Sequence, residues 1–475
     1  MVSISKEEFI EEYSKVLIKG NAAIFAGAGL STEAGFVNWH NLIKPLATKI
    51  GLNSDKETDL ISVAQYYINE DGGNKHDISE IINNFFDSNE IPENIKIISR
   101  LPIHTFWTTN YDSLLEDGLK DSNKLVDIKR SIDNLNNNKY NRDAVIYKMH
   151  GDKSQPNKTI ISKDDYESYE EKYGLFRTLL KADLLSKTFL FIGFSFDDPN
   201  LQYILAQLRL ASPQNLKTHY CFFEKIKQDK NETDEDFNYR KIKQDLKIED
   251  LRRYGIKAII LDNYSKITEI LNTLESTVLQ KKIFVSGSID KYDSEWTKEK
   301  VNEFTYLLGN DLVKNDYTVV SGFGSGIGSS IINGSLREIF DNKNGHVDDY
   351  LKLYPFPQTK NSEELWPIYR EKVMKNVGIC IFIFGNKIQK ESNSPIDANG
   401  VISEFNIAKK YKKIIIPIGS TGWASKTIWN EVNQNIHEYP YLRKYIDKLG
   451  SEKDPEQIMK LIKNIISDLP QGNNL

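Results

Sequence analysis

The pattern that most constrains this chain is a repeated one: in its N-terminal half, short apolar runs end in small or polar motifs. In chain order the motifs are Gly27-Ala28-Gly29-Leu30-Ser31, Thr108-Thr109-Asn110-Tyr111-Asp112, His150-Gly151-Asp152 and Gly193-Phe194-Ser195-Phe196-Asp197-Asp198-Pro199. Such apolar runs are typical of buried strands in a parallel sheet, and ligands bind at the carboxyl ends of these strands. The motifs therefore predict one pocket that holds a dinucleotide by its phosphates and places an amide and an imidazole beside a ribose. A pocket of that kind indicates cleavage of NAD.

Composition excludes several classes of protein. The chain has 475 residues, 39% of them hydrophobic, which suits about two or three globular domains of ~150 residues each. A net charge of -5 argues against nucleic-acid binding, because neutralising phosphates requires a basic surface. Cys221 and Cys380 are the only cysteines, so the chain offers neither a disulfide framework nor a thiolate zinc site. We expect no bound metal and no nucleic-acid partner.

No segment predicts export or membrane insertion. Residues 1–9 lack the basic start and the apolar stretch of a secretion signal. The longest apolar runs, 379–384 and 414–418, are far shorter than the ~20 residues that a membrane span requires. We therefore expect a soluble, cytoplasmic protein that does not contact membranes.

Short β-rich runs alternate with helical stretches, which predicts a mostly parallel α/β architecture. A new strand at 282–288 opens into a Gly-Ser turn, as nucleotide-binding sheets usually begin. We therefore expect a Rossmann-type domain at 1–280, with a helical insertion between 39 and 103 that covers the sheet edge, and a Rossmann-like α/β domain at 281–475. The expected strands are 22–25, 105–108, 144–148, 189–192, 219–223 and 257–261 in the first domain, and 282–288, 317–320, 377–384 and 413–418 in the second.

The glycine turn after the first strand is expected to bind the pyrophosphate. Gly27 and Gly29 allow close backbone approach, and a helix starting after the turn would supply free N–H groups and a partial positive charge. Ser31 would cap that helix or bind a phosphate oxygen, and Ser195 would bind the adenosine ribose or a phosphate. The residues expected to contact the dinucleotide are Ala26, Gly27, Ala28, Gly29, Ser31, Thr109, Asp112, Gly193 and Ser195.

Asn110 and His150 are the expected catalytic residues. Each follows a predicted strand, so both side chains should project into the crevice at the carboxyl edge of the sheet. An uncharged amide can hold ribose hydroxyls or an attacking water, and an imidazole can accept a proton near neutral pH. Taken singly, such an asparagine is more often a turn residue and such a histidine more often structural. Asp112 and Asp198 are more simply explained as helix starts, the latter with Pro199 at the first helical position.

The ordered motifs of the N-terminal domain resemble the sirtuin family, and more closely its bacterial SIR2-like defence branch. In sirtuins the equivalents of Asn110 and His150 lie against the nicotinamide ribose. Two features depart from sirtuin deacylases: two distant cysteines cannot form their four-cysteine zinc ribbon, and the segment Gly35-Phe36-Val37-Asn38-Trp39 lacks the arginine they usually carry there. The resemblance therefore implies that NAD+ is a substrate for plain hydrolysis rather than for protein deacylation.

Glycines also gather at the expected strand ends of the C-terminal domain, where phosphates could dock, although the run 321–328 could instead be a tight helix entry. This series, with Arg370 in one helix and Glu404 opening another, resembles the nucleotide-binding SLOG superfamily. Its fuller proline-glycine-glycine signature is missing at 398–400, which argues against catalysis by this domain. We expect Arg370 to make a forked contact with phosphate, Lys387 a point-charge contact, and Glu404 to accept ribose hydroxyls. The expected set is Gly287, Ser288, Gly324, Arg370, Lys387 and Glu404.

A SIR2-like domain followed directly by a SLOG domain resembles the effector of the Thoeris anti-phage system. The resemblance implies that the first domain hydrolyses NAD+ when a cyclic ADP-ribose isomer, made by a partner TIR-domain protein, binds the second. An unregulated enzyme of this kind would kill its host, so an inactive assembly must convert on ligand binding, and we expect a homo-oligomer, a tetramer or larger. Two alternatives stay open: an NAD-dependent protein deacylase and a non-catalytic nucleotide receptor.

Overall fold

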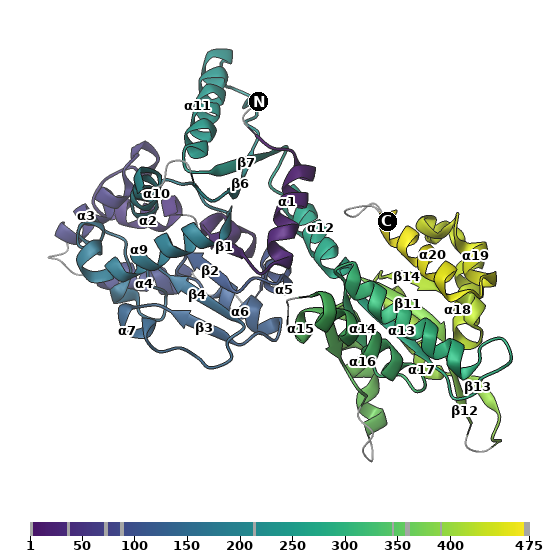
Figure 1. Cartoon of the computed structure of the whole chain (residues 1–475). Helices are drawn as coiled ribbons and strands as arrows, with labels where there is room; N and C mark the ends of the chain where they lie inside the picture. The colour runs from purple at the N-terminus through teal and green to yellow at the C-terminus, as the bar shows by residue number, and fades with distance from the viewer. Residues whose placement is uncertain are drawn as a thin grey trace. The chain divides into compact units, whose positions relative to one another are not determined.

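The computed structural model describes residues 3–35, 39–70, 75–85, 90–211, 215–343, 346–356, 362–389 and 392–469. The chain divides into two compact units, Met1–Glu275 and Ser276–Leu475 (Figure 1). The division falls within helix α12 (Lys266–Gln280), and the boundary expected after residue 280 coincides with the end of the same helix. We refer to the two parts as the N-terminal and C-terminal units.

The N-terminal unit is built on a seven-stranded parallel sheet with the spatial order β3-β4-β2-β1-β5-β6-β7. β3 alone was not predicted, because its sequence Val-Asp-Ile-Lys carries two charges. Both charged side chains are buried, and Lys129 Nζ lies 3.0 Å from Asp127 Oδ2, so each neutralises the other. The strands are β1 (Ala22–Ala26), β2 (Thr105–Thr108), β3 (Val126–Lys129), β4 (Ala144–Lys148), β5 (Thr188–Ile192), β6 (His219–Glu224) and β7 (Ile256–Leu261).

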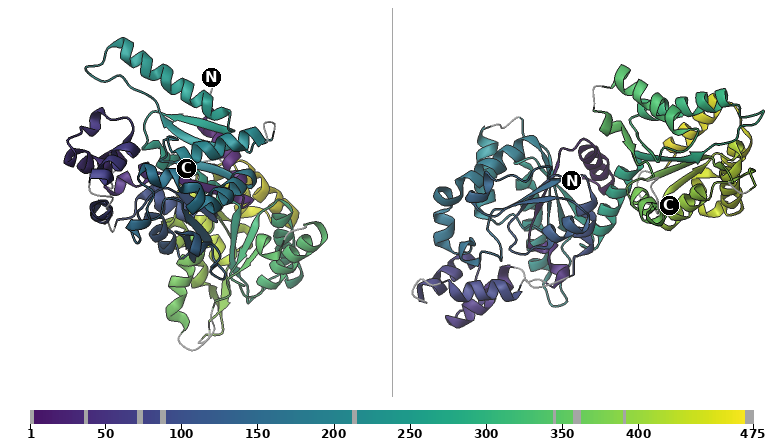
Figure 2. Two further views of the ribbon diagram at one scale, coloured as in Figure 1. Left: turned by 90° about the vertical axis from the view of Figure 1, so that its left-hand side faces the viewer. Right: turned by 90° about the horizontal axis from the view of Figure 1, so that it is seen from below.

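Helices cover both faces of this sheet (Figures 1 and 2). On one face Phe25 and Phe191 pack into a cluster with side chains of α9 and α10, and on the other Phe9 of α1 contacts the ring of Tyr220. The expected helical insertion contains α2 to α5. The helices are α1 (Lys6–Ile18), α2 (Trp39–Lys49), α3 (Leu60–Glu70), α4 (His76–Phe85), α5 (Glu93–Arg100), α6 (Leu114–Asp121), α7 (Ile132–Leu135), α8 (Lys163–Glu167), α9 (Tyr169–Ser186), α10 (Pro199–Ala211), α11 (Asp234–Arg252) and α12.

The loops after β1 and β5 touch at the centre of the sheet. The strand order changes direction between these two strands, and open α/β sheets bind ligands at such a point. The Gly29 N–H donates to the Gly193 carbonyl at 2.9 Å. A Cβ on Gly27 would lie 2.3 Å from that carbonyl oxygen, and a Cβ on Gly193 would lie 2.2 Å from the nitrogen of Leu30. These glycines therefore allow the two loops to approach each other closely.

The C-terminal unit contains a five-stranded parallel sheet in the order β10-β9-β8-β11-β14 and a two-stranded antiparallel hairpin. The short β10 and the hairpin were not predicted, because three residues are too few to show a period of two. The strands are β8 (Lys282–Ser288), β9 (Thr318–Ser321), β10 (Leu351–Leu353), β11 (Ile379–Phe384) and β14 (Ile414–Pro417), and the hairpin is formed by β12 (Asn386–Ile388) and β13 (Pro395–Asp397).

Helices also flank this second sheet, and α13 packs along α14. The expected fold class, two Rossmann-type parallel α/β domains with a helical insertion in the first, is confirmed. The helices are α13 (Lys298–Lys314), α14 (Gly328–Asn342), α15 (Val347–Tyr350), α16 (Trp366–Lys375), α17 (Asn399–Lys410), α18 (Trp423–Gln434), α19 (Ile446–Ser451) and α20 (Pro455–Ser467).

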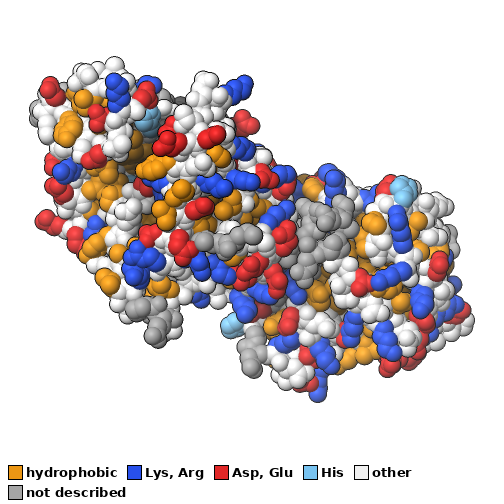
Figure 3. Space-filling view, turned by 90° about the horizontal axis from the view of Figure 1, so that it is seen from above, with side chains coloured by type: hydrophobic (Ala, Val, Ile, Leu, Met, Phe, Trp, Pro, Cys, Tyr) orange, Lys and Arg blue, Asp and Glu red, His pale blue; other side chains and the backbone are white. Residues whose placement is uncertain are grey.

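The surface carries charges of both signs. On the face shown in Figure 3, Lys and Arg side chains alternate with Asp and Glu side chains over both units. Within the described ranges, no helix is long and apolar enough to cross a membrane.

We predict that Gly193→Ala lowers the free energy of unfolding of the N-terminal unit by about 3 kcal/mol, because the methyl group would meet the Leu30 backbone. Gly20→Ala is the matched control. Gly20 has a similar φ, +70° against +66°, but no atom lies within 4 Å of its Cβ position, so only the left-handed backbone strain of about 1 kcal/mol applies. Urea unfolding of both variants measures the difference, and equal losses would contradict the role assigned to the loop contact.

Candidate active site

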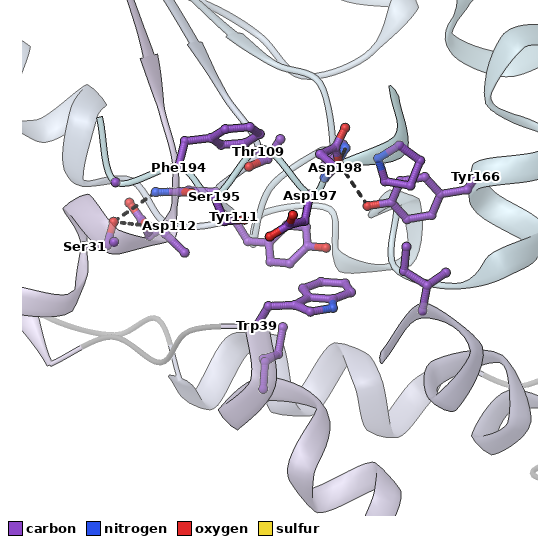
Figure 4. A pocket seen from close by; sticks show the side chains of 18 residues that line it. Ser31, Trp39, Thr109, Tyr111, Asp112, Tyr166, Phe194, Ser195, Asp197 and Asp198 are labelled. Atoms are coloured by element: carbon purple, nitrogen blue, oxygen red, sulfur yellow. Dashed lines mark hydrogen bonds and ion pairs between the residues drawn. The ribbon is translucent and has the colours of Figure 1, made fainter. Parts of the chain in front are cut away.

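A cavity of about 330 Å³ lies at the carboxyl ends of β1, β2, β4 and β5 (Figure 4). These four strands are neighbours in the sheet, which is why motifs far apart in the sequence meet. Ala26 and Gly27 are not among the lining residues: Ala26 is fully buried at the end of β1, and Gly27 lies behind Asn110. The expected residues that line the cavity are Ala28, Gly29, Ser31, Thr109, Asn110, Asp112, His150, Gly193 and Ser195.

Asn110 is held so that its side-chain carbonyl oxygen stays unpaired. Its Nδ2 group donates to the Gly27 carbonyl at 3.0 Å and to Oγ of Ser31 at 3.1 Å. Its Oδ1 atom is buried and has no hydrogen-bond partner among the residues that the structure describes. A buried acceptor without a partner at a cavity wall suits a hydrogen bond from a ribose hydroxyl or a water molecule.

The loop after β1 differs from expectation. Residues 28–34 form two three-residue 3₁₀ turns, η1 (Ala28–Leu30) and η2 (Thr32–Ala34), so the prediction of a helix start at the glycine turn is wrong. The Ser31 hydroxyl caps no helix and instead donates to Oδ2 of Asp112 at 2.8 Å (Figure 4). Oδ1 of Asp112 accepts from the Leu114 N–H, which starts α6 as expected. Asp112 therefore connects the β1 loop to the β2 loop.

His150 and the largely buried Asp198 both line the cavity, and their side chains face each other. Its Nε2 atom is 3.2 Å from Oδ2 of Asp198, within ion-pair distance but outside hydrogen-bond alignment. The Tyr166 hydroxyl donates to the same Oδ2 atom at 3.3 Å (Figure 4), and Oδ1 accepts from the Leu201 N–H at 2.9 Å. Burial alone would raise the pKa of Asp198, but His150 and these hydrogen bonds hold it below its usual range. The expected helix start at Asp198 is confirmed, and its second oxygen faces the histidine.

Several lining residues were missed in the sequence. Trp39 and Leu42 of α2 and Ile61 of α3 bring apolar side chains of the helical insertion to the cavity, as Figure 4 shows for Trp39. Tyr166 and Phe194 add aromatic rings. The periodicity of an amphipathic helix shows that it has a buried face, but not which distant loop that face meets.

A network of buried charged groups connects the two loops that carry the candidate catalytic residues Asn110 and His150. Lys148 ends β4, two residues before His150, and its Nζ donates to Oε1 of Glu116 at 2.9 Å and to the carbonyl of Asp112. Asp152 lies 3.6 Å from the same ammonium group. Burial would raise the pKa of Asp152, but the charge of Lys148, with Ser154 and Arg130, keeps it below its usual value. The network ties the loop that carries His150 to the loop that carries Asn110.

A second cavity, of about 320 Å³, lies at the carboxyl ends of β8 and β9 in the C-terminal unit. Lys387 is not among its lining residues; it lies on β12 of the hairpin. Of the residues expected to bind a nucleotide here, Gly287, Ser288, Gly324, Arg370 and Glu404 line this cavity.

In this second cavity the buried Glu404 pairs with the partly exposed Arg370. Arg370 Nε lies 3.4 Å from Oε1 of Glu404, and Oε2 accepts from the Ser286 hydroxyl at 2.5 Å. The guanidinium group also lies 4.9 Å from the ring centre of Phe356, a cation–π distance. Burial raises the pKa of Glu404, although Ser286 and Arg370 oppose the shift. Glu404, expected to accept ribose hydroxyls, already holds two protein partners.

Across the described residues, no group of three or more His, Cys, Asp or Glu side chains could hold a metal ion. The two cysteines are each buried, in different units.

Comparison with known families agrees with this architecture. A family model described as the SIR2-like domain matches residues 104–249, which include Asn110, His150 and Asp198. A model described as the Sir2- and TIR-associating SLOG family matches residues 266–469, which include Arg370 and Glu404. Both resemblances recognised in the sequence are confirmed.

Several relatives match the chain over nearly their full length. The chain is 45% identical over 464 residues to the NAD(+) hydrolase ThsA of Bacillus cereus (strain MSX-D12), covering 97% of each chain. It is 43% identical over 489 residues to the ThsA of Cytobacillus dafuensis, covering 99% of this chain and 98% of the relative. The ThsA of Acinetobacter baumannii (strain 532279) is 40% identical over 471 residues, covering 96% and 98%. The chain therefore belongs to the ThsA family, in which a SIR2-like domain precedes a SLOG domain.

Proposed function

We propose that this chain hydrolyses NAD+ to nicotinamide and ADP-ribose in the cavity of its N-terminal unit. The observation that carries the proposal is that Asn110 and His150 line the same cavity, where Oδ1 of Asn110 has no hydrogen-bond partner among the described residues. Aromatic side chains form part of the cavity wall. The printed names of the full-length relatives, NAD(+) hydrolases, support the same activity. In this proposal the loops that carry Ala28, Gly29 and Ser195 contact the pyrophosphate and the adenosine ribose.

The reaction consumes one water molecule and releases one proton. The bond between the nicotinamide nitrogen and the ribose carbon breaks, and its electron pair leaves with the nitrogen, which neutralises the pyridinium ring. Cleavage of this kind passes through an oxocarbenium-like state and depends mainly on enclosure and orientation. Asn110 orients a ribose hydroxyl or the water through Oδ1, and His150 accepts the proton. The aromatic faces of Trp39 and Phe194 suit a cationic ring, because the ring quadrupole attracts positive charge.

We further propose that the C-terminal unit gates this reaction. The signal is a cyclic ADP-ribose isomer made by a TIR-domain protein, and the setting is cytoplasmic anti-phage defence by a homo-oligomer, a tetramer or larger. The description of the matching family as Sir2- and TIR-associating supports a TIR-related partner. Arg370 supports phosphate recognition, because a guanidinium held over a ring presents a rigid fork of donors. The proposed signal site contains Gly287, Ser288, Gly324, Arg370 and Glu404, with Lys387 as an additional contact from the hairpin.

We predict that His150→Ala lowers kcat about 10²- to 10⁴-fold, as loss of a general base usually does, and that Asn110→Ala also lowers kcat, because the ribose hydroxyl or the water loses the acceptor that orients it. Release of nicotinamide from NAD+ is followed by chromatography, with and without a panel of cyclic ADP-ribose linkage isomers. His437→Ala, at an exposed histidine of the C-terminal unit, is the control and should keep wild-type turnover. Release that requires an acyl-lysine peptide would instead identify a deacylase, and binding of NAD+ without turnover a receptor.

We predict that Arg370→Ala abolishes activation by the cyclic nucleotide while NAD+ affinity stays unchanged, because the fork to phosphate is lost. Arg337→Ala is the matched control, since Arg337 is exposed on α14 and pairs only with Asp341 among the described residues. Lys387→Ala tests whether the hairpin contributes. Undiminished activation of Arg370→Ala, with a thermal unfolding profile like the wild type, would remove the sensor role from this cavity.

A further inference from the structure

We propose that Asp198 is the positioning residue of the hydrolytic site: it holds the His150 ring by Nε2, so that Nδ1 is the atom that accepts the proton. The proposal rests on the proposed role of His150 as the base. In the sequence Asp198 belongs to the fourth motif, but the only role expected for it there was to start α10. Its position in the structure joins the loop after β5 to the loop after β4.

The two oxygens of Asp198 have different partners. Oδ1 accepts from the Leu201 N–H and caps α10, whereas Oδ2 lies 3.2 Å from Nε2 of His150 and 3.3 Å from the Tyr166 hydroxyl. The side chain of Asp198 is only 8% exposed. A buried carboxylate with two hydrogen-bond donors and an imidazole around it remains ionised, and the lowered pKa agrees with that state.

The surroundings of the His150 ring leave one nitrogen, Nδ1, to accept a proton. Nε2 is buried, and Oδ2 of Asp198 lies 3.2 Å from it. Nδ1 has no hydrogen-bond partner there either but is not enclosed as Nε2 is, and His150 lines the cavity. A carboxylate at Nε2 favours the neutral tautomer that carries its hydrogen on Nε2 and its lone pair on Nδ1. The same carboxylate stabilises the imidazolium formed when Nδ1 takes a proton.

Tyr166 secures the carboxylate in turn. Its ring stands nearly perpendicular to the His150 ring, with centroids 5.6 Å apart and an interplanar angle of 83°. Its hydroxyl donates to Asp198, so the oxygen that faces the imidazole keeps a fixed direction. The site thus contains a base, a carboxylate that orients it and a phenol that orients the carboxylate.

Asp198→Asn separates the charge from the helix cap, because asparagine caps helices as well as aspartate does. We expect this variant to fold like the wild type and to lose about 10²- to 10⁴-fold in kcat, as an orienting aspartate does when it becomes asparagine, with KM changed less than about threefold. Asp454→Asn is the matched control: Asp454 caps α20 through the Gln457 N–H at 2.9 Å, in the other unit. It should keep wild-type kcat.

A double-mutant cycle decides whether Asp198 acts through His150. If it does, the variant carrying both His150→Ala and Asp198→Asn is no slower than His150→Ala alone. Multiplying effects, or a raised KM at unchanged kcat, would show that Asp198 contacts substrate instead and would overturn the proposal. Wild-type turnover of His150→Ala would show that His150 is not the base, which refutes the proposed function of that residue. An inactive His150→Ala together with a fully active Asp198→Asn would refute only the positioning role of Asp198.

A spectroscopic readout tests the same point without turnover. The chain has 7 histidines, and in ¹⁵N-histidine-labelled protein the His150 signals are those that His150→Ala removes. We expect the wild-type ring to be the Nε2–H tautomer and the Asp198→Asn ring to lose that preference. An unchanged tautomer in Asp198→Asn would contradict the proposal.

Discussion

The contact between the loops after β1 and β5 is the constraint on which the N-terminal cavity depends. The Gly193 carbonyl occupies the space that a side chain at Gly27 would need, so neither loop can move outward without losing the other. The Gly27 carbonyl then accepts from Asn110, and Asn110 shares Ser31 with Asp112. The close approach of the two loop backbones thus orients the Asn110 amide at the cavity wall, because each of these hydrogen bonds depends on the one before it.

In both units glycines allow two backbone segments to approach closely beside the cavity. The units differ in the polar side chains that line the cavity. In the C-terminal unit a Cβ on Gly324 would lie 2.0 Å from the Gly287 carbonyl oxygen, so the loop after β9 also requires glycine where it meets the end of β8. In the N-terminal cavity, Oδ1 of Asn110 and Nε2 of His150 have no hydrogen-bond partner among the described residues, which suits the proposed catalysis. In the C-terminal cavity the charged groups are already paired, Arg370 with Glu404. That arrangement suits recognition of a phosphate by exchange of partners rather than bond breaking.

The sequence predicts both sheets and the meeting of the four motifs, because strand ends of a parallel sheet share one edge. The sequence does not predict which side chains contact one another across that edge of the sheet. Ser31 looked like a helix cap, but its hydroxyl binds Asp112, a residue that only the folded sheet brings near. Asp198 was recognised as a helix start, and its second oxygen could not be assigned because the position of His150 relative to α10 depends on how β4 and β5 are ordered. The apolar side chains that α2 and α3 bring to the cavity were missed because helical periodicity does not show which distant loop a buried face meets.

Magnitudes limit how the proposed signal in the C-terminal cavity could control hydrolysis in the N-terminal cavity. Converting a resting population from about 99:1 inactive to 1:99 requires a ligand that prefers the active state about 10⁴-fold, or about 5.5 kcal/mol. One hydrogen bond to a charged group contributes about 1.5–3 kcal/mol net, so Arg370 alone falls short. The difference must come from further contacts along the cavity, or from several subunits that convert together and add their preferences. If the proposed switch is steep, it favours the proposed homo-oligomer over an isolated chain, because the summed preferences of several subunits reach the required free-energy difference without exceptional affinity at any one site.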